Sequence, residues 1–184
     1  METILERGTA QILYQTYAFD ADLFSQLRDE VPWRQNKIRM FGKEFNEPRL
    51  TAWFGPAYQY SNIIWEEKAF SATMEKLRAE VSKRANFEFN AVLLNLYRDG
   101  NDSMGWHRDN EPEMDTRWIA SVTLGASRTF KVRSRETKEV WNLELEDGSL
   151  LLMHDLQEAY EHAVPKRKKV LEPRINLTFR RIRT

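Results

Sequence analysis

Short segments with a β-strand pattern follow one another from residue 87 to the end of the 184-residue chain, and this succession constrains the fold more than any other feature. Apolar side chains there recur at every second position or form short runs, and turn sequences such as Asp99-Gly100 and Asp147-Gly148 separate the segments. The expected strands are residues 91–97, 118–124, 129–133, 140–145, 149–153 and 174–180. Strands of this length and spacing are typical of a sandwich or jelly roll.

The residues before this region predict two helices. Asp20 is expected to cap a helix over residues 21–31, which Pro32 ends because proline lacks the N–H that a helix interior needs. A second helix is predicted by apolar residues at helical spacing, namely Phe70, Met74, Leu77 and Val81. The chain shows no internal repeat and no linker rich in proline, glycine or serine. We therefore predict a single domain over residues 1–184, mainly β with N-terminal α/β elements.

Charge is balanced, with 28 basic and 28 acidic residues, so the whole molecule is not expected to attract a polyanion. Any nucleic-acid surface must therefore be local. Basic residues do form clusters, for which a solvated surface is the ordinary explanation. The clusters are Arg34, Lys37, Arg39, Lys43 and Arg49, then residues 166–169, and finally Arg180, Arg181 and Arg183.

The chain contains no cysteine, which excludes disulfides, thiolate zinc sites and a cysteine nucleophile. Metal chemistry would need histidine and carboxylate ligands. No apolar run approaches the roughly 18 residues of a membrane-spanning helix, and the N-terminus lacks the apolar segment of a signal peptide. We expect a cytoplasmic protein without a membrane partner.

The segment MGWHRDNE places His107 and Asp109 two residues apart. His-Arg-Asp also occurs in protein-kinase catalytic loops, but Met114 stands where such a loop needs asparagine, and the other kinase motifs are missing. In an extended segment His107 and Asp109 project to one side, with Arg108 opposite. Together with a second histidine they can form the two-histidine, one-carboxylate site of non-haem Fe(II) enzymes. A polar surface turn is the alternative.

Two further histidines are available as the third ligand. His154 follows the predicted strand 149–153, and His162 precedes a short extended segment that leads to the basic run 166–169. The pattern of residues alone leaves this choice open.

The C-terminal sequence RINLTFR alternates between polar and apolar residues. Arg174, Asn176, Thr178 and Arg180 share one face of the expected strand, and the apolar residues share the other. A half-exposed strand is one interpretation, and an anion site is the other, because a guanidinium grips a carboxylate through two hydrogen bonds. Asn95 and Tyr97 form a second polar pair on an otherwise apolar strand, and buried polar groups need partners.

These motifs together resemble the AlkB family of Fe(II)- and 2-oxoglutarate-dependent dioxygenases, which remove N-alkyl groups from nucleic-acid bases. The motifs in chain order are Asn95-x-Tyr97, His107-x-Asp109, His162 and Arg174-x-Asn176-x-Thr178-x-Arg180. The resemblance covers about residues 39–183 and is closest to DNA-repair members with an NLYRDG segment and an NLTFR strand. It implies a double-stranded β-helix, or jelly roll, with two packing helices. Residues 1–86 would form an N-terminal extension and substrate-binding lid, and residues 87–184 the dioxygenase core.

The resemblance also implies the chemistry of the site. His107, Asp109 and His162 would bind Fe(II), which leaves His154 in a structural or supporting role. The co-substrates would be 2-oxoglutarate and O2. Arg174 would pair with the far carboxylate of 2-oxoglutarate, and Arg180 would lie near the iron and the substrate as a further catalytic and cofactor-binding residue. The residues that assist Arg174 would be Asn95, Tyr97, Asn176 and Thr178.

The implied substrate contacts lie mostly in the N-terminal half. Met40, Phe41, Gly42 and Lys43 resemble a finger that enters a duplex where a base has flipped out, although a buried strand and turn is the alternative. Arg49, Tyr58, Tyr60 and Ser61 resemble the lid, with Tyr58 equally typical of a core aromatic residue. Asn110 stands where close relatives have an acid, and Glu111 would favour a positively charged lesion.

The expected function is oxidative demethylation of DNA bases of the 1-methyladenine and 3-methylcytosine type, with release of formaldehyde and succinate. The expected partner is DNA, with RNA as an alternative, and the protein is expected to be a monomer. Two other functions remain: the same chemistry on RNA or a small molecule, and a non-catalytic nucleic-acid-binding module.

Overall fold

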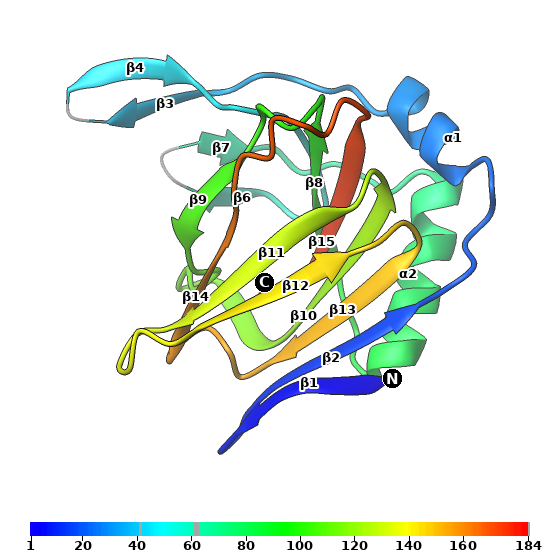
Figure 1. Cartoon of the computed structure of the whole chain (residues 1–184). Coiled ribbons are helices and arrows are strands. Elements are labelled where there is room, and N and C mark those ends of the chain that lie inside the picture. Colours follow the sequence, from blue (N-terminus) through cyan, green and yellow to red (C-terminus); the bar gives the residue numbers. More distant parts are fainter. Residues whose placement is uncertain (41, 61–62, 184) are drawn as a thin grey trace.

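Two antiparallel β-sheets face each other in the computed structural model, which describes residues 1–40, 42–60 and 63–183 (Figure 1). The larger sheet has seven strands in the order β1-β2-β13-β10-β15-β8-β5. They are β1 (Glu2–Arg7), β2 (Ala10–Thr16), β13 (Ser149–His154), β10 (Met114–Gly125), β15 (Arg174–Ile182), β8 (Ala91–Tyr97) and β5 (Leu50–Phe54). The smaller sheet has four strands in the order β12-β11-β14-β9. They are β12 (Val140–Leu145), β11 (Arg128–Ser134), β14 (Tyr160–Val164) and β9 (Met104–His107).

The space between the two sheets holds one apolar core. Leu93 and Ile119 of the larger sheet pack in the same buried cluster as Phe130 and Val132 of the smaller sheet. This sandwich arises because strand side chains alternate between faces, so each sheet presents one set of side chains to the other. The predicted jelly-roll architecture is confirmed.

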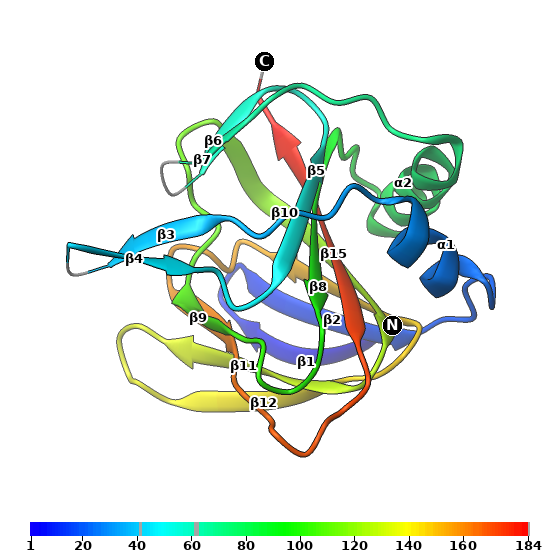
Figure 2. The ribbon, with the colours of Figure 1, turned by 90° about the horizontal axis from the view of Figure 1, so that it is seen from above.

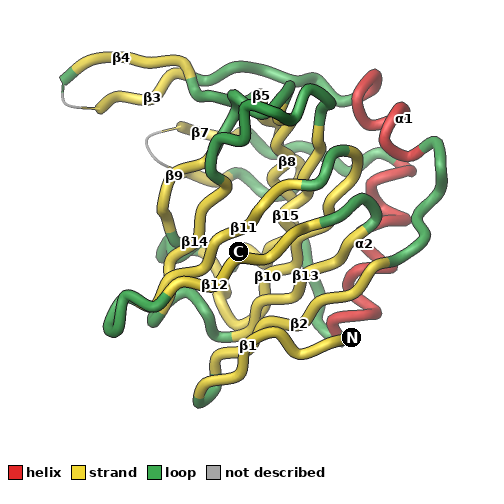
Figure 3. The backbone as a smooth tube through the Cα atoms, viewed as in Figure 1, coloured by secondary structure: helices red, strands yellow, loops and turns green. Residues whose placement is uncertain are grey.

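A second apolar core lies on the outer face of the larger sheet, beneath two helices, α1 (Leu23–Glu30) and α2 (Ala72–Ala85) (Figure 3). Leu27 and Val81 of the helices pack with Leu94 and Leu177 of the sheet. Central strands of this sheet are therefore buried on both faces, unlike the half-exposed strand that remained as one interpretation of RINLTFR. In the described part of the chain, neither helix has the length and apolar character needed to cross a membrane.

Local sequence explains where α2 begins and ends. The hydroxyl of Ser71 accepts a hydrogen bond from the Met74 N–H at 3.3 Å, which satisfies one of the free donors of the first turn. Asn86 ends the helix in the left-handed conformation with φ of 48°. At α1 the prediction was wrong in detail, because Asp22 and not Asp20 is the N-cap residue. The Asp20 carboxylate instead accepts a hydrogen bond from the Asp22 N–H, and the first helical turn begins after Asp22.

Two small hairpins lie beside the sandwich: β3 (Lys37–Met40) with β4 (Lys43–Asn46), and β6 (Tyr58–Tyr60) with β7 (Ile63–Trp65). Figure 2 shows the β3–β4 hairpin projecting from the same side of the molecule as β9 and the β11–β12 hairpin. The strands predicted after residue 87 are all present. Before that residue the chain holds β1 to β7 as well as α1 and α2, in agreement with the expected N-terminal α/β elements, although residue ranges had been predicted for the two helices only. Several of these strands have only three or four residues, too few to show a pattern of alternation.

The NLYRDG turn and the basic run 166–169 are fastened to each other. The Gly100 N–H donates to the Val170 carbonyl at 2.8 Å, and the Arg167 N–H donates to the Gly100 carbonyl at 2.7 Å. A Cβ atom at Gly100 would collide with the Arg167 carbonyl, so only glycine permits this approach. The two motifs therefore form one structural unit. The division of the chain at residue 86 stays a prediction, although β1, β2 and β5 pair into the larger sheet.

Candidate active site

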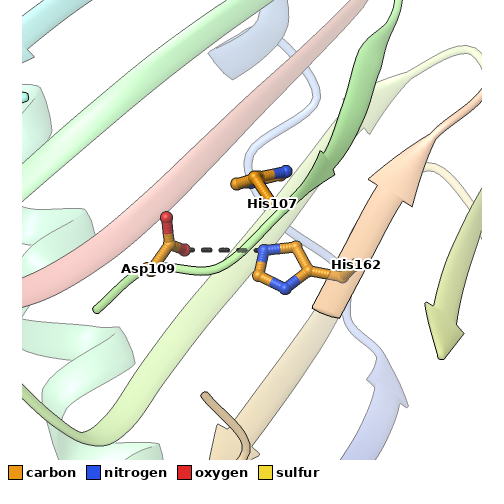
Figure 4. Close-up of side chains that lie close together, drawn as sticks. All are labelled: His107, Asp109 and His162. Carbon is orange, nitrogen blue, oxygen red and sulfur yellow. Dashed lines mark ion pairs between the residues drawn. The ribbon is translucent and has the colours of Figure 1, made fainter. Parts of the chain in front are cut away.

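Three side chains that can bind a metal ion converge between the sheets (Figure 4). His107 ends β9, Asp109 lies in the loop that follows, and His162 lies in the middle of β14. The antiparallel register of β14 and β9 pairs His162 directly with His107, which brings residues 55 positions apart into contact. Their ligand atoms all lie within 4.8 Å of one another.

The hydrogen bond of His107 leaves one ring nitrogen for a metal ion. Its Nδ1 lies 2.8 Å from the Gly105 carbonyl, and a carbonyl can only accept, so Nδ1 carries the proton and Nε2 keeps its lone pair. Burial, together with the nearby His162, lowers the pKa of His107 to about 3. His107 is therefore neutral at physiological pH, as a metal ligand must be.

Asp109 is an ionised carboxylate held by an arginine. Arg180 donates from Nη2 to its Oδ1 at 2.6 Å, while its Oδ2 lies 3.6 Å from Nε2 of His162. Burial alone would raise the pKa of Asp109, but the charge of Arg180 and the hydrogen bond to His162 outweigh burial and hold this pKa below its usual range. One carboxylate oxygen is thus engaged by Arg180, and the other faces the two imidazoles.

The three ligands fit a non-haem Fe(II) ion. Two neutral imidazoles and one carboxylate are the ligand set of the facial triad, which leaves coordination positions open for other molecules. Asp109 and His162 are both buried, with 1% and 4% of their surfaces exposed. The site therefore lies in the interior of the sandwich and not in a polar surface turn.

A second polar group lines the same interior cavity. Arg174 is 1% exposed, lies over the Tyr97 ring at 5.3 Å and donates to Thr123 Oγ1 at 2.8 Å. Burial lowers its pKa to about 10, so the guanidinium still carries its charge at physiological pH. Among the described residues no carboxylate lies within ion-pair distance of Arg174. Buried charges are normally paired, so Arg174 is expected to bind an anion. The cavity that Arg174 lines is also lined by His107, Asp109 and His162.

Comparison with known proteins agrees with this chemistry. The family model of the 2OG-Fe(II) oxygenase superfamily matches residues 12–180. The chain belongs to this superfamily. Its cofactor and co-substrates are therefore Fe(II), 2-oxoglutarate and O2.

Similar proteins include the bovine DNA oxidative demethylase ALKBH2, 38% identical over 88% of this chain and 64% of the relative. The human alpha-ketoglutarate-dependent dioxygenase alkB homolog 3 is 35% identical over 87% of this chain and 60% of the relative. The mouse DNA oxidative demethylase ALKBH2 is 39% identical and is covered to 74%. The chain thus spans less than two thirds of the bovine and human relatives. The solved structure of OsALKBH1 aligns with a TM-score of 0.66 at 14% identity, covering 98% of this chain and 100% of that one, and supports the fold.

Other polar residues of this oxygenase cavity are already hydrogen-bonded within the protein. Asn176 donates to Ser121 Oγ at 2.7 Å and to a backbone carbonyl, and Thr178 donates to Asn176 Oδ1 at 3.2 Å. Asn95 accepts from Arg49 at 2.8 Å. These side chains form the polar wall beside Arg174, with Tyr97 beneath it.

Two of the residues predicted to contact substrate, Arg49 and Tyr58, are buried. Arg49 forms an ion pair with Glu47 at 2.9 Å and donates to Asn95, so its contact with substrate stays a prediction. Tyr58 is buried and stacked on Trp53, with ring centroids 5.0 Å apart.

Other predicted residues lie on the surface or outside the described part of the chain. Gly42, Lys43 and Asn110 are exposed, and Glu111 is half-buried. Phe41 and Ser61 lie outside the described residues, as do the side chains of Met40 and Tyr60.

His154 lies away from the metal-binding group. Its Nδ1 donates to the Thr9 carbonyl at 2.9 Å, and its ring packs on Trp118 with centroids 4.4 Å apart. It therefore holds the β1–β2 turn against the end of β13 within the larger sheet, which agrees with a structural role.

Sequence inspection missed Gln157, which lies in the turn between β13 and β14. Its Oε1 accepts from the Asp109 N–H at 3.0 Å, and its backbone carbonyl lies 3.4 Å from an Arg108 nitrogen. Gln157 is 2% exposed, whereas its neighbour Glu158 is exposed. A glutamine in a polar turn carries no signal of burial, so only the fold reveals this contact.

We predict that Gln157→Met weakens metal binding about 10-fold or more, because groups that hold metal ligands in place have effects of this size. The substitution removes the acceptor of the buried Asp109 N–H. Calorimetric titration with Co(II) measures the affinity, and thermal unfolding of the metal-free protein reports any general loss of stability. Glu158→Met in the same turn is the matched control and should bind Co(II) normally. Equal affinity of the two variants would contradict a role for Gln157 in placing Asp109.

Proposed function

We propose that this oxygenase demethylates N-alkylated bases in DNA, of the 1-methyladenine and 3-methylcytosine type. The proposal rests on one observation, which is that the metal-binding group and the buried Arg174 line the same cavity. The similarity to proteins named DNA oxidative demethylase supports the substrate class. A monomeric state and a cytoplasmic location stay predictions.

In this proposal His107, Asp109 and His162 hold Fe(II), and Arg174 binds the far carboxylate of 2-oxoglutarate. The Arg174 guanidinium has Nε and Nη1 buried without a partner among the described residues, which supports pairing with a carboxylate. Arg180 fixes the orientation of Asp109 through the 2.6 Å bond and keeps its second oxygen directed at the metal position. Asn95, Tyr97, Asn176 and Thr178 shape the wall against which 2-oxoglutarate lies.

Bound iron, with 2-oxoglutarate and O2, supplies an oxidant that hydroxylates the N-methyl carbon, with succinate and CO2 as co-products. The hydroxylated methyl group then leaves as formaldehyde and the base is restored. The protein contributes a site that lies between the two sheets, where Asp109 and His162 are buried. It also keeps His107 neutral and Asp109 ionised without any bound ligand.

The surroundings of the metal-binding group support a cationic base as substrate. Glu111 lies close enough to Asp109 and Tyr58 to interact with both. Burial and the charge of Asp109 raise the pKa of Glu111. A cationic base beside Glu111 would oppose both effects and favour the ionised carboxylate, with which it would pair. The β3–β4 hairpin, with Gly42 at φ of 76° and an exposed Lys43, suits insertion beside a flipped base.

The decisive experiment incubates the protein with Fe(II), 2-oxoglutarate and oligonucleotides that carry 1-methyladenine or 3-methylcytosine. We expect formaldehyde and restored base with wild type and His154→Ala, and loss of both products with His107→Ala because a metal ligand is gone. Formaldehyde is measured by a coupled assay and the base by mass spectrometry. Succinate formation without demethylation of DNA would reject the proposal. Turnover of methylated RNA alone would show that RNA, and not DNA, is the substrate.

Arg174→Met should weaken 2-oxoglutarate binding about 10-fold to 100-fold, as expected for the loss of hydrogen bonds to a charged group. The affinity is measured by calorimetry on Co(II)-loaded protein. The Co(II) affinity itself serves as the control, since Arg174 makes no contact with the three ligands. Arg174→Lys keeps the positive charge but loses the paired donors of the guanidinium. Its affinity for 2-oxoglutarate should lie between those of wild type and Arg174→Met. An unchanged 2-oxoglutarate affinity in Arg174→Met would place the co-substrate elsewhere.

Glu111→Gln should reduce the preference for charged lesions, because the substitution removes the negative charge and keeps the shape of the side chain. We expect kcat/KM for 1-methyladenine to fall by about 10-fold relative to that for the neutral lesion 1-methylguanine, a ratio that corresponds to about 1.4 kcal/mol. The two rates are measured on oligonucleotides of identical sequence. A ratio equal to that of wild type would show that Glu111 does not discriminate by charge.

A further inference from the structure

An exposed tryptophan stands next to the metal ligand on the outermost strand of the smaller sheet. Trp106 precedes His107 on β9 and is 37% exposed. Two more of the exposed large apolar side chains, Phe45 of β4 and Ile64 of β7, belong to the small hairpins. Figures 1 and 2 show β4, β7 and β9 on one side of the molecule. The proposed chemistry does not use these three exposed apolar side chains.

The Trp106 ring is held in place from one side. The Arg133 guanidinium lies 4.2 Å from the ring centroid, and Glu161 binds that guanidinium at 2.7 Å and 2.6 Å through two of its nitrogens. The three residues form a row across β11, β14 and β9. Because the ring is already fixed, a flat partner that stacks on it loses little further side-chain entropy.

The backbone beside Trp106 is open, and a cation stands next to it. A Cβ atom at Gly105 would meet no other atom within 4 Å, so a bulky chain has room to approach. Arg108 is half-buried, and its only hydrogen bond among the described residues is the long one to the Gln157 carbonyl. No described carboxylate forms an ion pair with Arg108. An aromatic face and a cation two residues apart match the base and the phosphate of one nucleotide.

We propose that Trp106 is a stacking platform for an unpaired base that flanks the base in the active site, and that Arg108 binds a phosphate of the same strand. The occupant is a nucleic-acid strand and not a protein, because the surface combines a ring with an unpaired cation beside a base-modifying site. This inference rests on the proposed function. Stacking accepts any base, so the platform increases affinity for single strands without reading their sequence.

The first test uses a fluorescein-labelled oligothymidylate of about 12 nucleotides, whose binding is followed by anisotropy. Trp106→Ala should raise its Kd by about 5-fold to 150-fold, the range that base–aromatic stacking gives. Trp106→Phe keeps a ring and should restore most of the affinity. Leu171→Ala removes a large exposed apolar side chain elsewhere and should bind as wild type does. Co(II) affinity and the thermal midpoint of each variant verify that the neighbouring ligand site is intact.

The second test measures Kd for the same oligonucleotide as a function of salt concentration. Arg108→Gln should reduce the slope of log Kd against log salt by about 0.7, the value for one phosphate contact on a single strand. Arg117→Gln is the matched control, since Arg117 is already paired with Asp115 at 2.6 Å and should leave the slope unchanged. A merely structural role of Arg108 would alter stability without altering this slope.

The two proposals can fail separately. If DNA is demethylated while Trp106→Ala binds the oligonucleotide as tightly as wild type, the platform is overturned and the proposed function stands. If no demethylation occurs but the Kd and the salt slope change as expected, the nucleic-acid platform stands without that chemistry. Failure of the wild-type protein to bind any oligonucleotide would overturn the platform.

Discussion

The ion pair between Arg180 and Asp109 is the interaction on which the rest of the site depends. Both groups lie between two apolar layers, where an unpaired charge would be very unfavourable. Arg180 balances the carboxylate before any metal is bound, so Asp109 can stay ionised in the interior. The arginine belongs to β15 and the carboxylate to the loop after β9, so the pair also joins the two sheets.

The same strand explains why the oxygenase cavity is polar inside a sandwich of apolar sheets. From Arg174 to Arg180 every second residue of β15 faces inward and is polar, while Ile175, Leu177 and Phe179 pack beneath the helices. The helices therefore make the polar face possible, because they supply the apolar contacts that stabilise the strand from its other side. Of the two inward arginines of β15, Arg180 pairs with Asp109, whereas Arg174 forms no ion pair with a described carboxylate. This difference supports Arg174 as the 2-oxoglutarate site.

Residues with strong chemical character were predictable, and residues with an ordinary appearance were not. His107, Asp109 and the alternating strand RINLTFR carry patterns that point to a metal and an anion. The late strands follow from alternation, short apolar runs and the turn sequences between them. The surroundings of Arg49 could not be read from its basic sequence neighbourhood, because in the fold Glu47 and Asn95 enclose it. Gln157 had no pattern at all, since a buried glutamine and an exposed one have the same local sequence.

By itself, the sequence determined the types of metal ligand, the alternation of strand faces and the resemblance to iron oxygenases. These depend only on residue identity and on short spacings along the chain. The sequence left the choice between His154 and His162 open until the family resemblance was considered. The tertiary structure brings His162 opposite His107, through the register of β14 and β9, and sends His154 to Thr9. Burial, pairing and proximity across tens of residues depend on how the sheets pack, and no local stretch of sequence contains that information.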